Sequence, residues 1–174
     1  MPSTDAGPFA AWVVAMQRGL LSGEGIEVPC GTCTACCESG QLIHLEPDEA
    51  VRLGIDVDDP VLRPDVDGRC PMLVEGSCQI YEHRPRICRS YDCRIFPATG
   101  IAPEDDKPRI VERVAQWRFQ FRSDDDRRRY EAVRLASSAL RQVQTGGRPT
   151  SATQLAAQAV LAHDELLQNN QPII

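Results

Sequence analysis

Eight cysteines, all between residues 30 and 93, constrain this chain more than any other feature of its sequence. They form two groups, the run CGTCTACC at residues 30–37 and a later segment that reads CPMLVEGSCQIYEHRPRICRSYDC. A Cys-x-x-Cys step places two sulfurs on one side of a tight turn, where backbone N–H groups can stabilise thiolate charge. We therefore predict that both groups close over metal, with eight candidate ligands: Cys30, Cys33, Cys36, Cys37, Cys70, Cys78, Cys88 and Cys93.

The spacing of the cysteines leaves the identity and the number of the metals open. Cys30, Cys33 and Cys36 resemble the local ligand run of a [4Fe–4S] cluster, whose fourth ligand comes from elsewhere in the chain. Zinc fits as well, with two nearby thiolates and two distant ones completing a tetrahedron. Cys37 leaves the backbone in a different direction from Cys36, so it could serve a second metal, bridge two metals or stay a free thiol. Zinc, iron and an iron–sulfur cluster are all retained as cofactors.

The composition indicates a globular protein kept in a reducing compartment. With 174 residues, 42% of them apolar, the chain can form one domain with a hydrophobic core. A net charge of −6 argues against a nucleic-acid partner, and no segment approaches the about 18 apolar residues of a membrane span. The N-terminus lacks a signal-peptide pattern. We therefore expect a cytoplasmic protein whose thiols bind metal, with disulfides or unligated buried thiols as the alternative.

Apolar periodicity and capping residues predict four helices. These span residues 5–22, 47–53, 124–144 and 151–168, the last with Ser151 and Gln154 as a capping box. Residues 109–121 fit either a helix or an alternating strand, and their length favours the helix. The expected fold is mainly α, a single domain over residues 1–174 with helices packed around an irregular cysteine-rich metal-binding centre at residues 26–100.

Charged and aromatic residues surround the second cysteine group. Arginines near Cys88 and Cys93 can offset thiolate charge, although in a chain with this many arginines they could equally be exposed residues. A histidine is an alternative ligand, because imidazole suits both zinc and iron. The residues in question are Arg69, Arg84, Arg86, Arg89 and Arg94, with Tyr81, Tyr91 and Asp92 as further supports and His44 or His83 as the alternative ligands.

These motifs together resemble a known family. CGTCTACC is a Cys-x-x-Cys-x-x-Cys-Cys signature, and with LIHLEPDE, CPML and CQIYEHRPRICRSYDCRIFPA it is similar to the YkgJ-type cysteine-cluster family of zinc- or iron-chelating domains. The resemblance covers about residues 9–121, and all eight cysteines match its pattern. It implies a bacterial, cytoplasmic, metal-binding protein.

A similar cysteine motif occurs in flagellin lysine methylases, where an iron–sulfur cluster is implicated. This chain has no Gly-rich nucleotide loop of the kind that follows the first strand of a Rossmann-type site. Methyltransferase activity is therefore not carried over from that resemblance.

The sequence is compatible with three functions. The leading one is a metal-binding protein that holds zinc or iron through thiolates in a structural, carrier or redox-sensing role. The alternative is an iron- or iron–sulfur-dependent enzyme of unknown reaction, with an open metal position beside Tyr91, Asp92, Arg89 or His83. A third is an interaction module whose arginines face an acidic protein partner.

Overall fold

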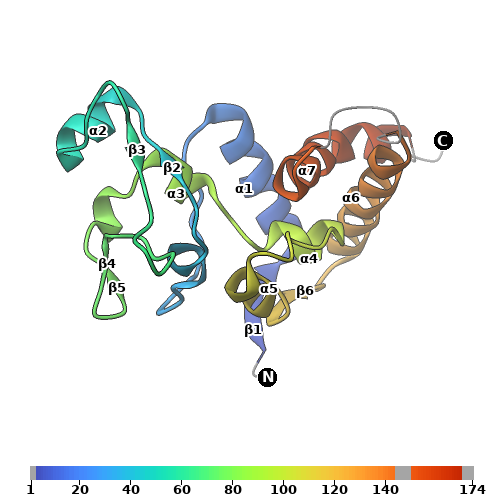
Figure 1. Ribbon diagram of the computed structural model, residues 1–174. Helices are drawn as coiled ribbons and strands as arrows, with labels where there is room; N and C mark the ends of the chain where they lie inside the picture. Colours follow the sequence, from blue (N-terminus) through green and yellow to red (C-terminus); the bar gives the residue numbers. More distant parts are fainter. Residues whose placement is uncertain (1–2, 144–149, 170–174) are drawn as a thin grey trace.

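The computed structural model describes residues 3–143 and 150–169, and its elements form two regions (Figure 1). We call the first the platform: β1 (Thr4–Pro8), α1 (Phe9–Ser22), α4 (Ile95–Thr99), α5 (Pro108–Val114), β6 (Trp117–Gln120), α6 (Asp124–Val143) and α7 (Ala152–Asn169). We call the second the cysteine lobe: η1 (Ala35–Glu38), β2 (Ile43–His44), α2 (Pro47–Leu53), β3 (Val61–Leu62), β4 (Leu73–Val74), β5 (Ser77–Cys78), η2 (Tyr81–His83) and α3 (Arg86–Ser90). Helices predominate over the short strands, which confirms the expected mainly α class.

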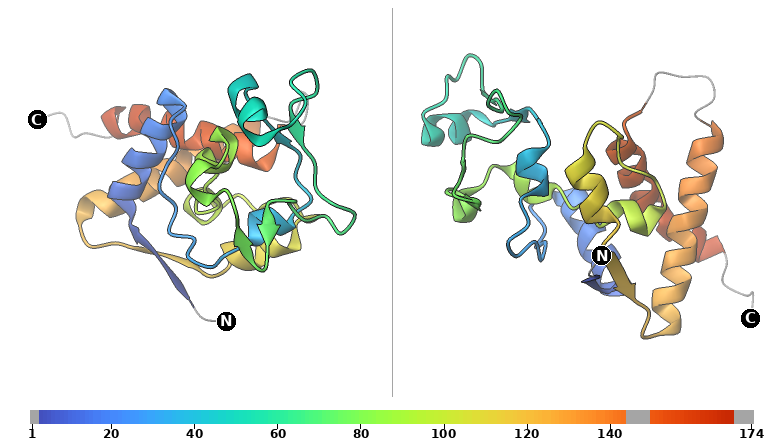
Figure 2. Two further views of the ribbon diagram at one scale, coloured as in Figure 1. Left: turned by 90° about the vertical axis from the view of Figure 1, so that its left-hand side faces the viewer. Right: turned by 60° about the horizontal axis from the view of Figure 1, so that its bottom comes forward.

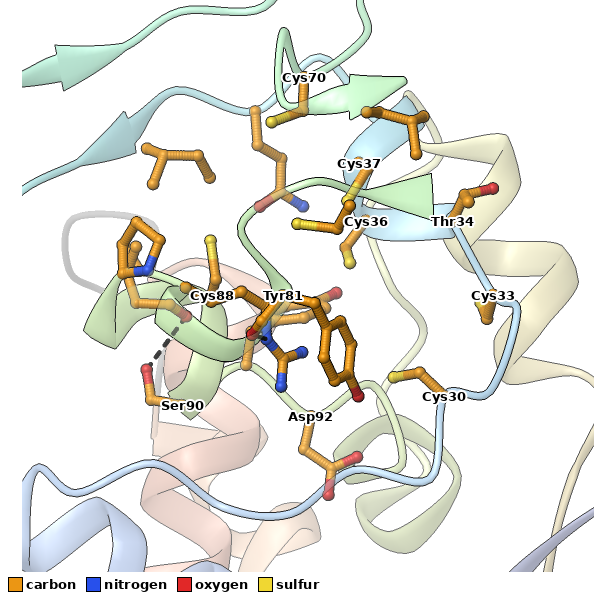
Figure 3. A pocket seen from close by; sticks show the side chains of 18 of the residues that line it. Cys30, Cys33, Thr34, Cys36, Cys37, Cys70, Tyr81, Cys88, Ser90 and Asp92 are labelled. Carbon is orange, nitrogen blue, oxygen red and sulfur yellow. Dashed lines mark hydrogen bonds between the residues drawn. The ribbon is translucent and has the colours of Figure 1, made fainter. Parts of the chain in front are cut away.

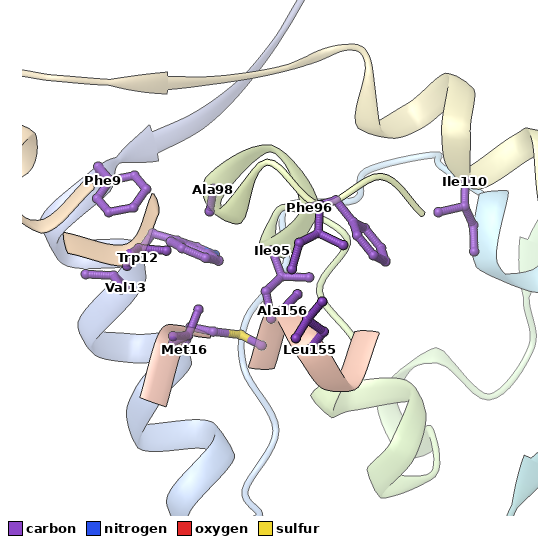
Figure 4. Packing of buried hydrophobic residues seen from close by; sticks show 13 residues of the cluster. Phe9, Trp12, Val13, Met16, Ile95, Phe96, Ala98, Ile110, Leu155 and Ala156 are labelled. Carbon is purple, nitrogen blue, oxygen red and sulfur yellow. The ribbon is translucent and has the colours of Figure 1, made fainter. Parts of the chain in front are cut away.

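The platform is built on an apolar core that joins both ends of the chain. The i, i+3, i+4 and i+7 positions of α1 bury Phe9, Trp12, Val13 and Met16, as the periodicity predicted. They pack against α4, α6 and α7 (Figure 4). The partners on these helices are Ile95, Phe96, Val133, Leu155, Ala156 and Val160. Helices α6 and α7 also pack against each other.

The prediction of a helix from residue 5 was wrong at its start. Residues 4–8 form β1, and α1 begins only at Phe9. Gly7 adopts a φ of 83°, outside the helical region, and Pro8 occupies the N-cap position with an extended backbone. The backbone of this segment instead pairs in parallel with β6, from Thr4 opposite Trp117 to Pro8 opposite Gln120.

The favoured helix over residues 109–121 was wrong in its second half. Helix α5 ends at Val114, and the alternating residues from Trp117 form β6. Strand β1, more than a hundred residues away in the sequence, supplies the backbone hydrogen bonds that make these residues a strand and not a helix. Local periodicity carries no information about such a partner.

The remaining predicted helices are confirmed. Helix α2 has the predicted bounds, and α6 begins at Asp124, with residue 144 outside the described residues. The capping box of α7 is present: Gln154 N donates to Ser151 Oγ at 3.2 Å, and Ser151 N donates to Gln154 Oε1 at 3.3 Å. None of the described helices is long and apolar enough to cross a membrane.

The cysteine lobe has little regular structure and a small core of its own. Its strands have two residues each, and its apolar cluster consists of the buried residues Leu45, Ala50 and Leu62. The buried Glu49 carboxylate fastens α2 to α3, because it accepts hydrogen bonds from Glu46 N at 3.1 Å and Arg86 N at 2.7 Å. The platform helices cover one side of this lobe and do not enclose it (Figure 2).

Candidate metal centre

Backbone hydrogen bonds bring the two cysteine groups together. Cys70 N donates to Cys37 O at 2.7 Å, and Gly40 N donates to Gly68 O at 2.9 Å close by. Within the first group, Cys33 N donates to Cys30 O at 3.0 Å, which closes the predicted Cys-x-x-Cys turn. Gly31 has a φ of 57° in this turn, a conformation that favours glycine.

Seven of the eight cysteines line one cavity of about 550 Å³ (Figure 3). The sulfurs of Cys36, Cys70 and Cys88 surround one part of this space, and Cys30 and Cys33 approach from the other side. Every cysteine of the chain is a free thiol, so the disulfide alternative finds no support. The seven are Cys30, Cys33, Cys36, Cys37, Cys70, Cys78 and Cys88.

Cys93 lies differently from the other seven cysteines. It does not line the cavity, and its Sγ accepts a hydrogen bond from Trp117 Nε1 at 3.1 Å. Its side chain also packs against the platform core. Metal ligation by Cys93 stays a prediction from the sequence, whereas its contact with Trp117 gives it a place in the packing of the platform.

The donor atoms of the cavity suit zinc or iron by chemistry but do not yet form a coordination shell. Zinc–sulfur bonds of about 2.3 Å in a tetrahedron place sulfurs about 3.8 Å apart. Within residues 3–143 and 150–169, no group of three or more His, Cys, Asp or Glu side chains is arranged to hold a metal ion. The thiols therefore share a cavity in which a metal would have to draw them closer.

Burial is the main influence on the thiols of this cavity. Burial raises the pKa of Cys30 to about 11 and that of Cys88 to about 12, and neighbouring thiol charges act in the same direction. The Arg84 guanidinium opposes both shifts. Burial also raises the pKa of Cys93 to about 12, against the hydrogen bond from Trp117. A metal ion that binds these sulfurs must therefore displace their protons.

Cys36 is the exception among these thiols. The Cys37 thiol donates a hydrogen bond to its sulfur, which lowers the pKa of Cys36 to about 7 and raises that of Cys37. The Cys36 side chain is also exposed, whereas the other cysteines are half-buried. The adjacent pair therefore differs in pKa and in exposure, while the hydrogen bond keeps the two sulfurs in contact.

A buried ion pair connects the cavity to the platform. Asp92 is a lining residue of the cavity, and its buried carboxylate, which points away from the sulfurs (Figure 3), accepts hydrogen bonds from Trp12 Nε1 at 2.8 Å and from Arg94 Nε at 2.9 Å. Arg94 in turn donates to Ala6 O at 3.2 Å and Glu27 O at 3.0 Å. Both charged side chains are almost completely buried. The pair therefore holds β1, α1 and the loop before Cys30 in one arrangement.

The other predicted supporting residues divide into two sets. Arg84 lines the cavity, where its guanidinium lies 3.8 Å from the centre of the Tyr81 ring and its Nε donates to Tyr81 O at 2.9 Å. Tyr81 and Tyr91 line the cavity as well. Outside its lining lie Arg69, Arg86, Arg89 and Arg94, together with the exposed alternative ligands His44 and His83.

The far wall of the cavity comes from the platform and was not predicted. Met16 and Leu20 of α1, Ile95 of α4 and Ala157 of α7 supply apolar surface. Lys107, the only lysine of the chain, also faces the cavity. No local sequence pattern connects these residues to the cysteines, because the fold alone brings them there.

Comparison with known protein families matches residues 29–117, just over half of the chain, to the CxxCxxCC family, described as a "Putative zinc- or iron-chelating domain". The chain belongs to the CxxCxxCC family. The matched CxxCxxCC region contains all eight cysteines and the whole lobe, and it ends before α6 and α7. Membership confirms the resemblance noted in the sequence and supports metal binding, without selecting zinc or iron. Neither the curated proteins nor the solved structures contain a match to this chain.

Proposed function

We propose that this protein binds zinc or iron through the thiolates of the cavity, and that the metal stabilises the cysteine lobe. One observation carries the proposal: seven cysteines from separate segments of a zinc- or iron-chelating domain line a single cavity. These segments are the loop after α1, η1, the turn before β4, β5 and α3. Thiolate ligands suit zinc, iron and iron–sulfur clusters alike.

A structural role of the metal is supported by the small apolar core of the lobe. Its own core has three buried apolar residues, so a metal joined to several segments would contribute much of its folding free energy. A redox-sensing role is supported by the exposure of Cys36, because oxidants in solution can reach its thiol, unlike a thiol inside a core. Oxidation of one ligand would release the metal and loosen the lobe.

Anaerobic purification followed by elemental analysis tests this function. We expect at least one zinc or iron atom per chain. An absorption band near roughly 400 nm would identify a cysteine-ligated iron cluster, and a colourless metal-loaded protein would identify zinc. Less than about 0.2 metal per chain, with all eight thiols titratable in the folded protein, would contradict the proposal.

A pair of serine variants assigns the ligands more finely. Cys88→Ser removes a cavity thiol and is expected to lower the metal content. Cys93→Ser removes the thiol that contacts Trp117, and it is expected to retain the metal if the cavity alone forms the site. Equal loss of metal in both variants would instead support Cys93 as a ligand, as the sequence predicted.

An iron- or iron–sulfur-dependent enzyme is the second candidate function. The cavity of about 550 Å³ is larger than a closed set of four thiolates around one metal requires, and Tyr91 and Asp92 line it as this function predicts. Arg89 and His83 do not line it. If the iron-loaded protein has an open coordination position, added azide will change its absorption spectrum. An unchanged spectrum in a sample with iron would contradict catalysis at an open metal position.

A further inference from the structure

The cavity extends well beyond the thiols, toward the platform. Its volume of about 550 Å³ lies within the range of about 300–1,000 Å³ that is typical of small-molecule sites. The wall opposite the cysteines is apolar and comes from Met16, Leu20, Ile95 and Ala157. These residues lie on three helices of the well-packed platform, so this wall is already formed before any ligand binds. The space suits the apolar body of a small organic molecule.

Lys107 and Tyr91 are two of the polar residues on this lining whose side chains have no partner in the part of the chain that the structure describes. Lys107 is half-buried, and among the described residues its ammonium group has neither an ion-pair nor a hydrogen-bond partner. The same holds for the Tyr91 hydroxyl, which also faces the cavity. Both groups can donate hydrogen bonds. A ligand that reaches them must offer acceptors.

The carboxylates that line the cavity are already engaged. Asp92 is paired with Arg94 and accepts from Trp12, and Glu104 accepts a hydrogen bond from Ala152 N at 3.1 Å. Asp92 is neutralised by Arg94, so the charged side chains that remain on the lining beyond the thiols are Glu104 against Lys107 and Arg84, which leaves one net positive charge. Among the described residues Lys107 forms no ion pair, and Arg84 is held through Tyr81. Electrostatic complementarity favours an anionic ligand over a cationic one.

We propose that the cavity binds a small organic carboxylate, with its apolar body against Met16, Leu20 and Ile95 and its carboxylate held by Lys107 and the Tyr91 hydroxyl. The inference rests on the proposed function only in that the ligand would lie beside a thiol-bound metal. Lys107, just before α5, and Tyr91, just after α3, define the carboxylate end of the site, and neither is a predicted metal ligand. Ligand binding and metal content are therefore measured as separate quantities.

Phenylacetate and its neutral counterpart phenylacetamide test the charge and the shape together. They are titrated into the full-length, metal-loaded protein, and binding is followed by ligand-observed NMR. We expect saturable binding of phenylacetate about tenfold tighter than that of phenylacetamide, because a charged hydrogen bond is lost in the amide. Lys107→Met should remove this preference. Arg18→Met, which removes an exposed cation of α1 outside the cavity, should leave it unchanged.

A second variant keeps the test decisive if Lys107→Met folds poorly. Ala157→Leu fills the apolar wall from α7 and should abolish binding of both compounds by blocking the space. Far-UV circular dichroism confirms folding of each variant. Equal affinity for the two compounds, a retained preference in Lys107→Met, or no saturable binding of either compound would each overturn the carboxylate site.

Elemental analysis of the same samples separates this outcome from the proposed function. Protein that holds zinc or iron but does not bind phenylacetate overturns the carboxylate site alone. Protein that binds phenylacetate through Lys107 without holding metal overturns the proposed function and leaves the carboxylate site standing.

Discussion

The platform and the cysteine lobe differ in what holds them together. The platform core contains 13 buried apolar residues from α1, α4, α5, α6, α7 and the loop after α4, whereas the lobe core contains three. Burial of a large aliphatic or aromatic side chain contributes about 1.5–3 kcal/mol. Apolar packing can therefore account for the platform, but the lobe depends on turns, the Glu49 hydrogen bonds and its thiols.

This difference bears on the proposed metal-binding function. A region that depends on a metal for its stability can respond when the metal is lost, because its ordered state then loses its main support. The platform remains as a fixed wall on the other side of the cavity. Loss of the metal would therefore change the structure of the lobe while the platform wall of the cavity keeps its structure.

Removal of the metal is expected to have the largest effect, and to destabilise the lobe much more than the platform. After chelation under anaerobic conditions, we expect amide hydrogens of residues 30–90 to exchange on the order of 100-fold faster, because the lobe loses the ligand that couples its segments. Amide hydrogens of α1, α6 and α7 should keep most of their protection, since their core needs no metal. Hydrogen exchange with mass spectrometry measures both regions in one sample.

Re-addition of zinc or iron is the control for this experiment, and it should restore the protection of the lobe. Equal acceleration in lobe and platform would show that the metal supports the whole chain. Unchanged exchange in the lobe would show that packing and turns suffice to hold it.

The next largest effect is expected at the ion pair that joins the two regions. Arg94→Met leaves the Asp92 carboxylate buried without its partner, which should lower the free energy of unfolding by about 3–5 kcal/mol. Urea denaturation measures this change. Arg89→Met removes a nearby exposed arginine and should change the free energy of unfolding by less than about 0.5 kcal/mol.

The double variant Asp92→Asn/Arg94→Met tests the physical reason. It removes the charge as well as its partner, so it should be more stable than Arg94→Met alone. If the double variant is no more stable, the loss comes from the bonds of Arg94 to Ala6 O and Glu27 O.

The sequence predicted these two regions unequally well. The apolar stripe of α1 and the capping signals of α2 and α7 are local, so they could be read directly and are confirmed. The pairing of β1 with β6 depends on a partner elsewhere in the chain; β1 was missed, and the strand at β6 was only the less favoured alternative. Local patterns therefore predicted the three long helices of the platform, α1, α6 and α7, but neither the short helix α4 nor the strand pair β1–β6.

The candidate site shows the same division. Regular spacing revealed the cysteines, and seven of them line one cavity. The sequence spacing does not separate Cys93 from the other cysteines, whereas in the structure its sulfur accepts a hydrogen bond from Trp117 outside the cavity lining. The position of Lys107 and Ala157 on the cavity lining could not be predicted, because it depends on how the fold brings α5 and α7 to the cavity.

A matched pair of leucine variants sharpens the comparison further. Leu62→Ala removes a buried side chain of the lobe, and Leu155→Ala removes one of the platform. Each should cost about 2–5 kcal/mol in the region that contains it, through lost burial and the cavity that is left. Hydrogen exchange should show faster exchange in residues 43–62 for Leu62→Ala and in α7 for Leu155→Ala. The same exchange pattern in both variants would show that lobe and platform unfold as one unit.

The smallest expected effect concerns the platform alone, at the start of α6. The Asp126 carboxylate accepts hydrogen bonds from Ala10 N at 2.8 Å, from Arg122 N and Ser123 N at 2.9 Å, and from Ser123 Oγ at 2.8 Å. These bonds lower the pKa of Asp126 to about 2, below its ordinary value of 3.8. The carboxylate therefore stabilises the fold above pH 3.8, and this contribution is lost as the pH falls through about 2.

Asp126→Asn should accordingly lower the Tm by about 5 °C near neutral pH, because the amide nitrogen cannot accept these bonds. The difference from the unmodified protein should shrink as the pH falls from 4 toward 2, since protonation weakens the same bonds in the parent chain. Thermal melts of α-helical circular dichroism at several pH values measure it. Asp124→Asn, at an exposed acid in the same turn, should shift the Tm by less than about 2 °C. A Tm difference for Asp126→Asn that stays constant down to pH 2 would mean that the side chain acts through its shape and not its charge.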